Sequence, residues 1–190
     1  YLLAIVPFAF AISYWVYIEN INVKIRIDDT LKSYGALANG KFEETTNLSS
    51  YALMSNVFIT KKNIQNHPLG SGLGSHIQMH SNYLPYMRTP KYIKSQDFES
   101  INSADANSLF LRIVSDLGVF GILLLVLLSL YLIKPFESSE MIFTQGIVIY
   151  ILLKLLRDGH YFPPELYFFV FIFYFSFKEN QEQKFSNITN

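Results

Sequence analysis

The chain has 190 residues, of which 51% are hydrophobic, 16% aromatic and only 16% charged, whereas soluble domains carry about 25% charged residues. Its 15 basic and 15 acidic residues cancel, which excludes an intrinsically disordered chain and a nucleic-acid-binding protein held by bulk positive charge. The absence of cysteine excludes disulfides and thiol nucleophiles. The composition favours a membrane protein. Because the chain starts at Tyr1 inside an apolar run, we interpret it as the C-terminal part of a longer protein.

Two long apolar runs, uncharged over residues 1–18 and 117–133, predict membrane helices, since about 20 apolar residues cross a hydrocarbon core of roughly 30 Å. The first covers residues 1–19 and carries Tyr14, Trp15 and Tyr17 at one end, as an interfacial aromatic belt does. It lacks the basic region and the cleavage site of a signal peptide. The second covers residues 117–134.

Two shorter apolar runs, residues 141–157 and 165–178, predict a third and a fourth membrane helix. They are long enough only if Lys154 and Glu165 lie near the lipid headgroups or against protein. We therefore expect an all-α fold, a polytopic membrane helical bundle of about four spans with a large, mainly helical external loop.

Alternation of four spans sets the side of each connecting segment. The large polar loop 20–116 and the hairpin 158–164 share one face of the membrane, and the turn 134–140 and the tail 179–190 share the other. We expect the large loop to be periplasmic and the tail to be cytoplasmic.

The large loop contains signals for two helices. Asn47 is a typical N-cap and Pro68 a helix terminator, so they predict an amphipathic helix near residues 48–66. A second helix near residues 104–117 runs directly into the second span. Residues 20–46 show no sustained period, and both a short strand and a helix remain open there.

Three glycines follow the first loop helix at alternate positions, Gly70, Gly72 and Gly74, and we call residues 68–75 the glycine segment. Glycine reaches backbone conformations closed to other residues and lets a ligand or another helix approach the main chain. The amides of such a loop can bind phosphate, although no lysine follows as in a P-loop. A flexible turn after a helix explains the same pattern.

The next segment, residues 77–102, is irregular and combines basic with aromatic side chains. This combination suits a sugar-phosphate ligand, and it equally suits a loop that lies on lipid headgroups. The residues concerned are Tyr83, Tyr86, Arg88, Lys91, Tyr92 and Lys94.

On the second loop helix, which Ser103 or Asp105 can cap, Asp105, Ser108, Arg112 and Asp116 form one polar stripe. An arginine so close to a membrane span is costly unless it meets water, an anion or a carboxylate. An Arg112–Asp116 pair or snorkelling to the interface is the alternative to an anion-binding role.

The hairpin between the last two spans concentrates Arg157, Asp158, His160 and Glu165. By alternation it faces the same side as Arg112, so we expect these groups to converge beneath the glycine segment. A histidine beside an arginine supplies acid–base and anion-binding groups, although hairpins between spans often carry a charge or two by chance.

The segment SNVFITKKNIQNHPLGSGLGSH, followed later by DANSLFLRIVSDLGVFGILLLVLLSLYLI, resembles the O-antigen ligase / O-antigen polymerase family of bacterial envelopes. Members have a Pro-Leu pair that leads into a GxGxGS-like motif, and then an NSLL-like element that enters the next span. The resemblance covers roughly residues 48–134. Its matching residues are Pro68, Leu69, Gly70, Gly72, Gly74, Ser75, Ala106, Asn107, Ser108, Leu109, Gly118 and Gly121.

Two positions depart from the family pattern. His67 stands where an asparagine often precedes the proline, and Ala106 stands where ligases usually place a histidine. The second departure argues against a lipid A core ligase and favours a polymerase-like member. His76, His80 or His160 could replace the missing group.

The resemblance implies glycosyl transfer from a polyprenyl-diphosphate-linked oligosaccharide to a sugar hydroxyl, without a cofactor and without a metal. The leaving diphosphate departs without protonation if arginines stabilise its charge. Our candidates are Arg112, Arg157 and Arg88, in that order.

A base must take the proton of the acceptor hydroxyl, and His160, Asp105 or Asp116 could serve. We place Arg112, His160 and Asp105 in the catalytic set. The expected substrate-binding residues are Arg157, Arg88, Gly70, Gly72, Gly74, His76, Asn107 and Ser108.

The resemblance further implies a multi-pass protein of the bacterial inner membrane that joins repeat units into O-antigen, capsule or exopolysaccharide. Its partners would be the lipid-linked oligosaccharide, the lipid bilayer and a chain-length regulator or flippase, with no nucleic acid. The alternatives are a ligase that transfers glycan to lipid A core, and a non-enzymatic polysaccharide transport or assembly protein.

Overall fold

The computed structural model describes residues 2–161 and 163–189, and within these ranges the chain is helical, without a named strand. The predicted all-α class is confirmed. The helices are α1 (Leu2–Glu19), α2 (Ile21–Ser33), α3 (Ala36–Asn39), α4 (Leu48–Asn66), α5 (His76–Tyr83), α6 (Lys91–Ser95), α7 (Leu109–Ile133), α8 (Ile142–Arg157) and α9 (Pro164–Thr189), with 3-10 helices η1 (Leu84–Tyr86), η2 (Lys134–Glu137) and η3 (Ser139–Met141).

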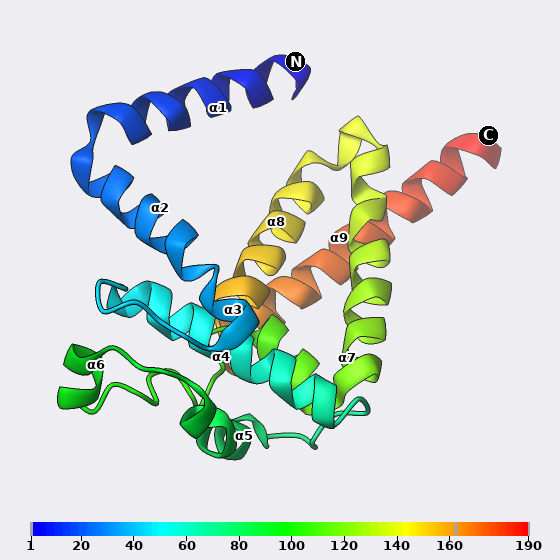
Figure 1. Ribbon diagram of the computed structural model, residues 1–190. Helices are drawn as coiled ribbons and strands as arrows, with labels where there is room; N and C mark the ends of the chain where they lie inside the picture. The colour runs from blue at the N-terminus through cyan, green and yellow to red at the C-terminus, as the bar shows by residue number, and fades with distance from the viewer. Residues whose placement is uncertain (1, 162, 190) are drawn as a thin grey trace.

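The helices form two groups in space (Figure 1), α7–α9, which we call the apolar group, and α3–α6, which we call the polar group. Helices α7, α8 and α9 pack against one another, and α4 crosses the N-terminal end of α7 with α5 and α6 beneath it. Helices α1 and α2 form an angled arm that joins the rest through α2 and α4. The segment 20–46, which the sequence left open, is therefore helical over most of its length.

Each group has its own core. One core is aliphatic and aromatic and joins the three long helices through residues such as Leu132, Val148 and Phe173. The other lies under α4, where Tyr51, Phe58 and Ile59 pack beneath the irregular loop segments. The polar group thus folds around buried side chains of its own and does not merely cover the long helices.

Helix α4 begins at Leu48, because the Asn47 side chain accepts a hydrogen bond from the Ser50 amide at 2.9 Å. The second loop helix differs from the expectation. It begins at Leu109 rather than near residue 104, because Ala106 and Asn107 adopt positive φ angles of 55° and 58°. Ser108, and not Ser103 or Asp105, is therefore the N-cap of α7.

Helix α7 is kinked at Gly118, which has φ 57° and ψ −132°. The kink frees backbone groups that the glycine segment satisfies. The Val119 amide donates to the Pro68 carbonyl and the Gly72 amide donates to the Asp116 carbonyl, both at 2.9 Å. A Cβ on Gly118 would overlap the Pro68 carbonyl oxygen. The glycine segment can therefore pack against the kink of α7 only because position 118 has no side chain.

Among the described residues, one helical segment, Leu109–Glu137 with 29 residues, is long and apolar enough to cross a membrane. Only 33% of its most apolar window is buried, unlike the core helix of a soluble protein. Helix α8 has 16 residues, which is fewer than the roughly 20 that cross a hydrocarbon core. The four-span arrangement stays a prediction.

Replacing Gly118 with alanine should lower the free energy of unfolding by about 2 kcal/mol or more, because the new methyl group meets backbone and φ is positive. Thermal unfolding of the detergent-purified protein measures this change. Gly146→Ala is the matched control, since nothing lies within 4 Å of its Cβ position. If Gly118→Ala unfolds at the wild-type temperature, the docked kink is wrong.

Candidate functional site

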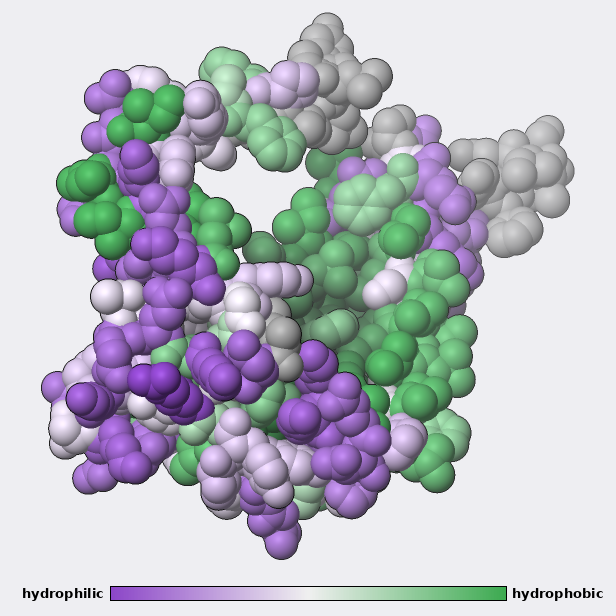
Figure 2. Space-filling model, in the orientation of Figure 1, coloured by the Kyte–Doolittle hydropathy of each residue, from purple (hydrophilic) through white to green (hydrophobic). Residues whose placement is uncertain are grey.

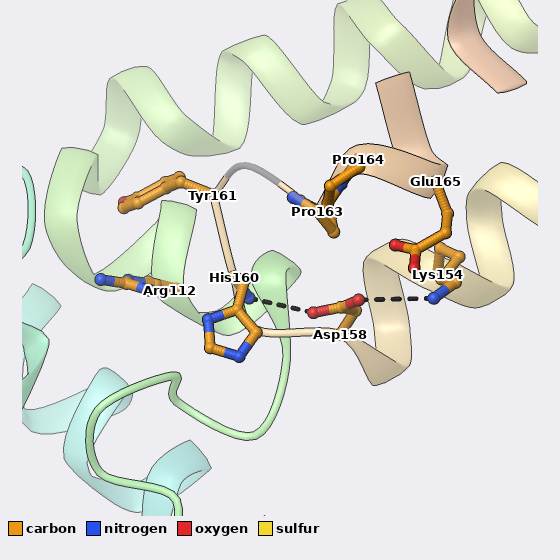
Figure 3. A pocket seen from close by; sticks show the side chains of 8 residues that line it. All are labelled: Arg112, Lys154, Asp158, His160, Tyr161, Pro163, Pro164 and Glu165. Carbon is orange, nitrogen blue, oxygen red and sulfur yellow. Dashed lines mark hydrogen bonds and ion pairs between the residues drawn. The ribbon is translucent and has the colours of Figure 1, made fainter. Parts of the chain in front are cut away.

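A pocket of about 680 Å³ opens where the first turns of α7, the end of α8 and the start of α9 meet (Figure 3). It lies at the border between the apolar helices and the polar group. The connection between α8 and α9 forms one wall. Its lining residues are Arg112, Lys154, Asp158, His160, Tyr161, Pro163, Pro164 and Glu165.

Backbone contacts hold this wall against α7. The Leu109 amide donates to the Asp158 carbonyl at 2.7 Å, and the Ser108 hydroxyl donates to the Leu155 carbonyl at 3.1 Å. Gly159 is packed so closely on Asp105 that a Cβ would overlap its backbone. The structure thus brings Arg112 and the α8–α9 hairpin together, as the sequence predicted.

Arg112 is held by groups that carry no negative charge. Its Nη1 donates to the Gly159 carbonyl at 3.0 Å, and its guanidinium lies 4.4 Å from the centre of the Tyr161 ring. Its Nε is buried and has no hydrogen-bond partner among the described residues. The described residues contain no ion pair between Arg112 and Asp116, the alternative that the sequence had left open.

Tyr161 separates the two charged groups. Its hydroxyl donates to the Asp116 carboxylate at 2.6 Å, while its ring lies against Arg112. Burial, followed by this hydrogen bond to Asp116, raises the pKa of the Tyr161 phenol well above its usual value. The phenol therefore stays protonated and keeps donating at physiological pH.

Asp116 is 1% exposed and accepts three hydrogen bonds. Besides Tyr161, the Gly74 amide donates to it at 2.7 Å and the Ser75 hydroxyl at 3.2 Å. Its carboxylate thus ties the glycine segment to the wall of the pocket. With its oxygens so engaged, Asp116 is a poor candidate for the base and a good one for a positioning residue.

The remaining charges of the pocket are partly paired. Lys154 and Asp158 form an ion pair at 3.4 Å, and Glu165 lies close by (Figure 3). The His160 amide donates to Asp158 at 3.2 Å, while its exposed imidazole forms no hydrogen bond with the described residues. Arg112 is the lining cation without a carboxylate partner among the described residues.

Two further pockets contain predicted residues. One of about 440 Å³ shares Lys154, Asp158 and His160 with it and adds Asp105 and Arg157. Another pocket, of about 570 Å³, shares Arg157 with the pocket of about 440 Å³ and includes Asn107. Four of the predicted residues, Arg112, His160, Asp105 and Arg157, therefore line two pockets that share Lys154, Asp158 and His160.

Other predicted residues lie elsewhere. The glycine segment docks on α7, and Ser108 caps that helix. The exposed Arg88 lies in the irregular loop, where its backbone pairs with Gly40 and Phe42, and it lines none of the three pockets.

His76 is fully buried beneath the site. Its Nδ1 lies 2.9 Å from the Ser115 hydroxyl and its Nε2 lies 3.0 Å from the Asn56 side-chain oxygen. The neighbouring His80 is equally buried, and neither of its ring nitrogens has a partner among the described residues. Burial lowers the pKa of His76 to about 3, with His80 and Arg112 adding to the effect, and lowers that of His80 to about 4. Both are therefore neutral core residues and not groups that a ligand reaches.

Sequence reasoning missed the roles of Tyr161 and Asn63. The Asn63 amide donates to the Ser71 hydroxyl at 2.7 Å and to the Ser115 carbonyl at 2.8 Å, which joins α4 to the glycine segment and to α7. A buried asparagine on the inner face of an amphipathic helix is the signal that could have indicated this contact. The described residues contain no group of three or more His, Asp or Glu side chains that could hold a metal ion.

Comparisons of the chain with protein-family models, with curated proteins and with solved structures found no match.

The two buried histidines predict an acid-sensitive fold. Their pKa is about 6.5 in the unfolded chain and lower in the native state, so the unfolded state binds more protons below pH 6.5. Stability is full above that pH and falls towards pH 4, by up to about 1.4 kcal/mol per pH unit for each histidine.

Replacing His80 with phenylalanine should remove about half of this pH slope without a large loss of stability at pH 7.5, because no hydrogen bond to the described residues is lost. Thermal unfolding between pH 7.5 and 5 measures the slope. Replacing the exposed His67 with glutamine leaves both buried rings in place and should preserve it. An unchanged slope in His80→Phe contradicts the burial of His80.

Proposed function

We propose that the chain is embedded in a membrane through α1, α7, α8 and α9, with the polar group on one side. Large apolar side chains are exposed along these helices, including Phe10 at 73%, Phe120 at 62%, Phe143 at 69% and Phe171 at 61%. So much exposed apolar surface is unfavourable in water and marks contact with lipid or protein. Figure 2 shows it gathered over α7–α9, apart from the hydrophilic surface of the polar group.

Single cysteines can test this topology, because the sequence contains none. A cysteine at Leu73 in the exposed glycine segment should react with a membrane-impermeant maleimide in intact spheroplasts. Cysteines at Phe136 and Glu182 should react only after permeabilisation, because alternation places them on the other side. Equal labelling of all three before permeabilisation would rule out the four-span arrangement.

We further propose that the protein is a glycosyltransferase of the O-antigen polymerase type, which joins polyprenyl-diphosphate-linked oligosaccharide units. The observation that carries this proposal is the Arg112 guanidinium at the border of the apolar helices. It lacks a carboxylate partner and has a buried, unpartnered Nε. A charge so placed is costly unless an anion completes its surroundings. A lipid diphosphate supplies two phosphates at the headgroup level and an apolar tail for the exposed helix faces.

The chemistry that follows is a single substitution. The oxygen of an acceptor hydroxyl attacks the anomeric carbon of the donor sugar, and the bond from that carbon to the diphosphate oxygen breaks. The bonding electrons stay on the diphosphate, whose charge Arg112 stabilises. His160 takes the hydroxyl proton. The products are a longer glycan, a polyprenyl diphosphate and a protonated imidazole.

Among the candidate bases, the geometry favours His160. Its imidazole is exposed to two pockets and unengaged by the described residues. Asp116 is buried and accepts three hydrogen bonds, and Asp105 already accepts the Asn107 amide at 2.9 Å. Arg157 lies in the adjoining pockets, where it serves as the second candidate for the diphosphate or for a sugar.

Arg112→Ala should lower chain extension by about 10²–10³-fold, because a preorganised donor to the developing charge is lost. Arg112→Lys should restore little of it, since a lysine ammonium cannot reproduce the planar fork of guanidinium donors. Gel ladders of cell-surface polysaccharide measure extension, and Lys41→Ala is the control because Lys41 is exposed and lines none of the three pockets.

An assay with purified lipid-linked oligosaccharide separates the alternatives. Elongated lipid-linked chains support a polymerase, transfer that requires lipid A core identifies a ligase, and movement of the unmodified substrate across a vesicle membrane identifies a transporter. A normal ladder in Arg112→Ala cells would remove Arg112 from the mechanism.

A further inference from the structure

A pocket of about 570 Å³ lies on the polar side of the reaction pocket, between α2, the start of α4 and the loop before α7. Of its residues, only Arg157 and Asn107 were predicted from the sequence as site residues. Arg157 also lines the pocket of about 440 Å³, and His160 is another of the residues that line that pocket. Arg157 is thus the lining residue that the polar pocket shares with the pocket of the group that we propose as the base.

Three amide side chains, Asn47, Asn102 and Asn107, are part of the lining of the polar pocket. The Asn102 amide group donates to the Asn107 side-chain oxygen at 2.6 Å. This bond leaves the Asn102 oxygen as an acceptor and the Asn107 amide group as a donor, neither of them hydrogen-bonded to the described residues. The Asn47 oxygen caps α4, which leaves its amide group unpartnered in the same way.

Charged groups also line the polar pocket. Arg26, Asp29 and Arg157 line the pocket, and none of them takes part in an ion pair among the described residues. Their guanidinium and carboxylate groups supply further donors and acceptors in fixed planar arrangements. Apolar side chains complete the lining, among them Ile25, Leu48 and Ile101.

This lining matches a saccharide better than it matches a bare diphosphate. A sugar hydroxyl both donates and accepts, so it pairs with an amide that offers one donor and one acceptor. The C–H faces of a sugar ring pack on the apolar side chains. A diphosphate offers acceptors alone and would leave the Asn102 oxygen and the Asp29 carboxylate without a partner.

We infer that this polar pocket binds the oligosaccharide of the acceptor and directs its reacting hydroxyl across Arg157 towards His160. The assignment to the acceptor rests on the proposed glycosyl transfer. The proposal that the pocket binds a saccharide is independent of glycosyl transfer, because it is argued from the lining groups alone.

Isosteric substitutions test the pocket. Asn47→Asp keeps the oxygen that caps α4 and removes the free amide donor. Asn107→Asp keeps the oxygen that accepts from Asn102, and aspartate tolerates the positive φ at that position. Asn82→Asp is the matched control, because it is an exposed asparagine outside the pocket.

The probe is the repeat-unit oligosaccharide released from the surface polysaccharide of the host cell. Its binding to the full chain in detergent is measured by saturation-transfer NMR titration, with thermal unfolding as the check on folding. We expect each pocket variant to bind about three- to tenfold more weakly, since each loses one hydrogen bond to the ligand. Asn82→Asp and Arg112→Ala should bind as the wild type does.

This inference is overturned if both folded pocket variants bind the oligosaccharide as tightly as the wild type does, or if the wild type itself does not bind it. Neither result contradicts the proposed glycosyl transfer, which chain extension in cells tests separately. Weaker binding by Arg112→Ala with no loss in the pocket variants would place the saccharide in the reaction pocket and overturn it equally. Saccharide binding at the polar pocket without any chain extension by the wild type would instead refute the proposed transfer and leave this site standing.

Discussion

The docking of the glycine segment on the kink of α7 is the contact on which the rest of the site depends. Gly70 and Gly118 meet backbone to backbone, so neither position has room for a side chain. The kink turns the first part of α7 away from its apolar part, and the Pro68 carbonyl accepts the hydrogen bond that the break leaves open. The polar group is thereby held at a fixed position on the end of the apolar helices.

The same docking also determines which groups pair with the charges of Asp116 and Arg112. Asp116 is buried at the contact, and donors from the glycine segment and from Tyr161 satisfy its carboxylate. A carboxylate that is satisfied by neutral donors leaves Arg112 without a counter-ion, although the two residues are one helical turn apart. The positive charge is therefore available to a ligand, and the phenol ring of Tyr161 stabilises it without neutralising it.

The division between apolar and polar surface places this charge at a boundary (Figure 2). Three pockets contain the predicted residues, and their lining changes from charged groups that are partly paired near Arg112 to a mixture of amides, charged groups and apolar side chains near Asn102. Such a gradient suits an amphiphilic substrate with a lipid tail, a charged link and a polar glycan. The glycosyl transfer and the saccharide pocket that we propose are two consequences of the same arrangement.

The sequence by itself determined the helical class and the cap at Asn47, because hydrophobic periods and caps are local signals. It predicted the nearness of Arg112 to the α8–α9 hairpin only through the alternation of four spans, which stays a prediction, and the contact itself is seen in the tertiary structure. It did not determine that Ser108 begins α7, that His76 is buried, or that Arg88 lies away from the pockets. Tertiary structure decided these points, and it chose Tyr161 over Arg112 as the partner of Asp116. The physical reason is that burial and pairing depend on groups far apart in the chain, whose packing no local pattern records.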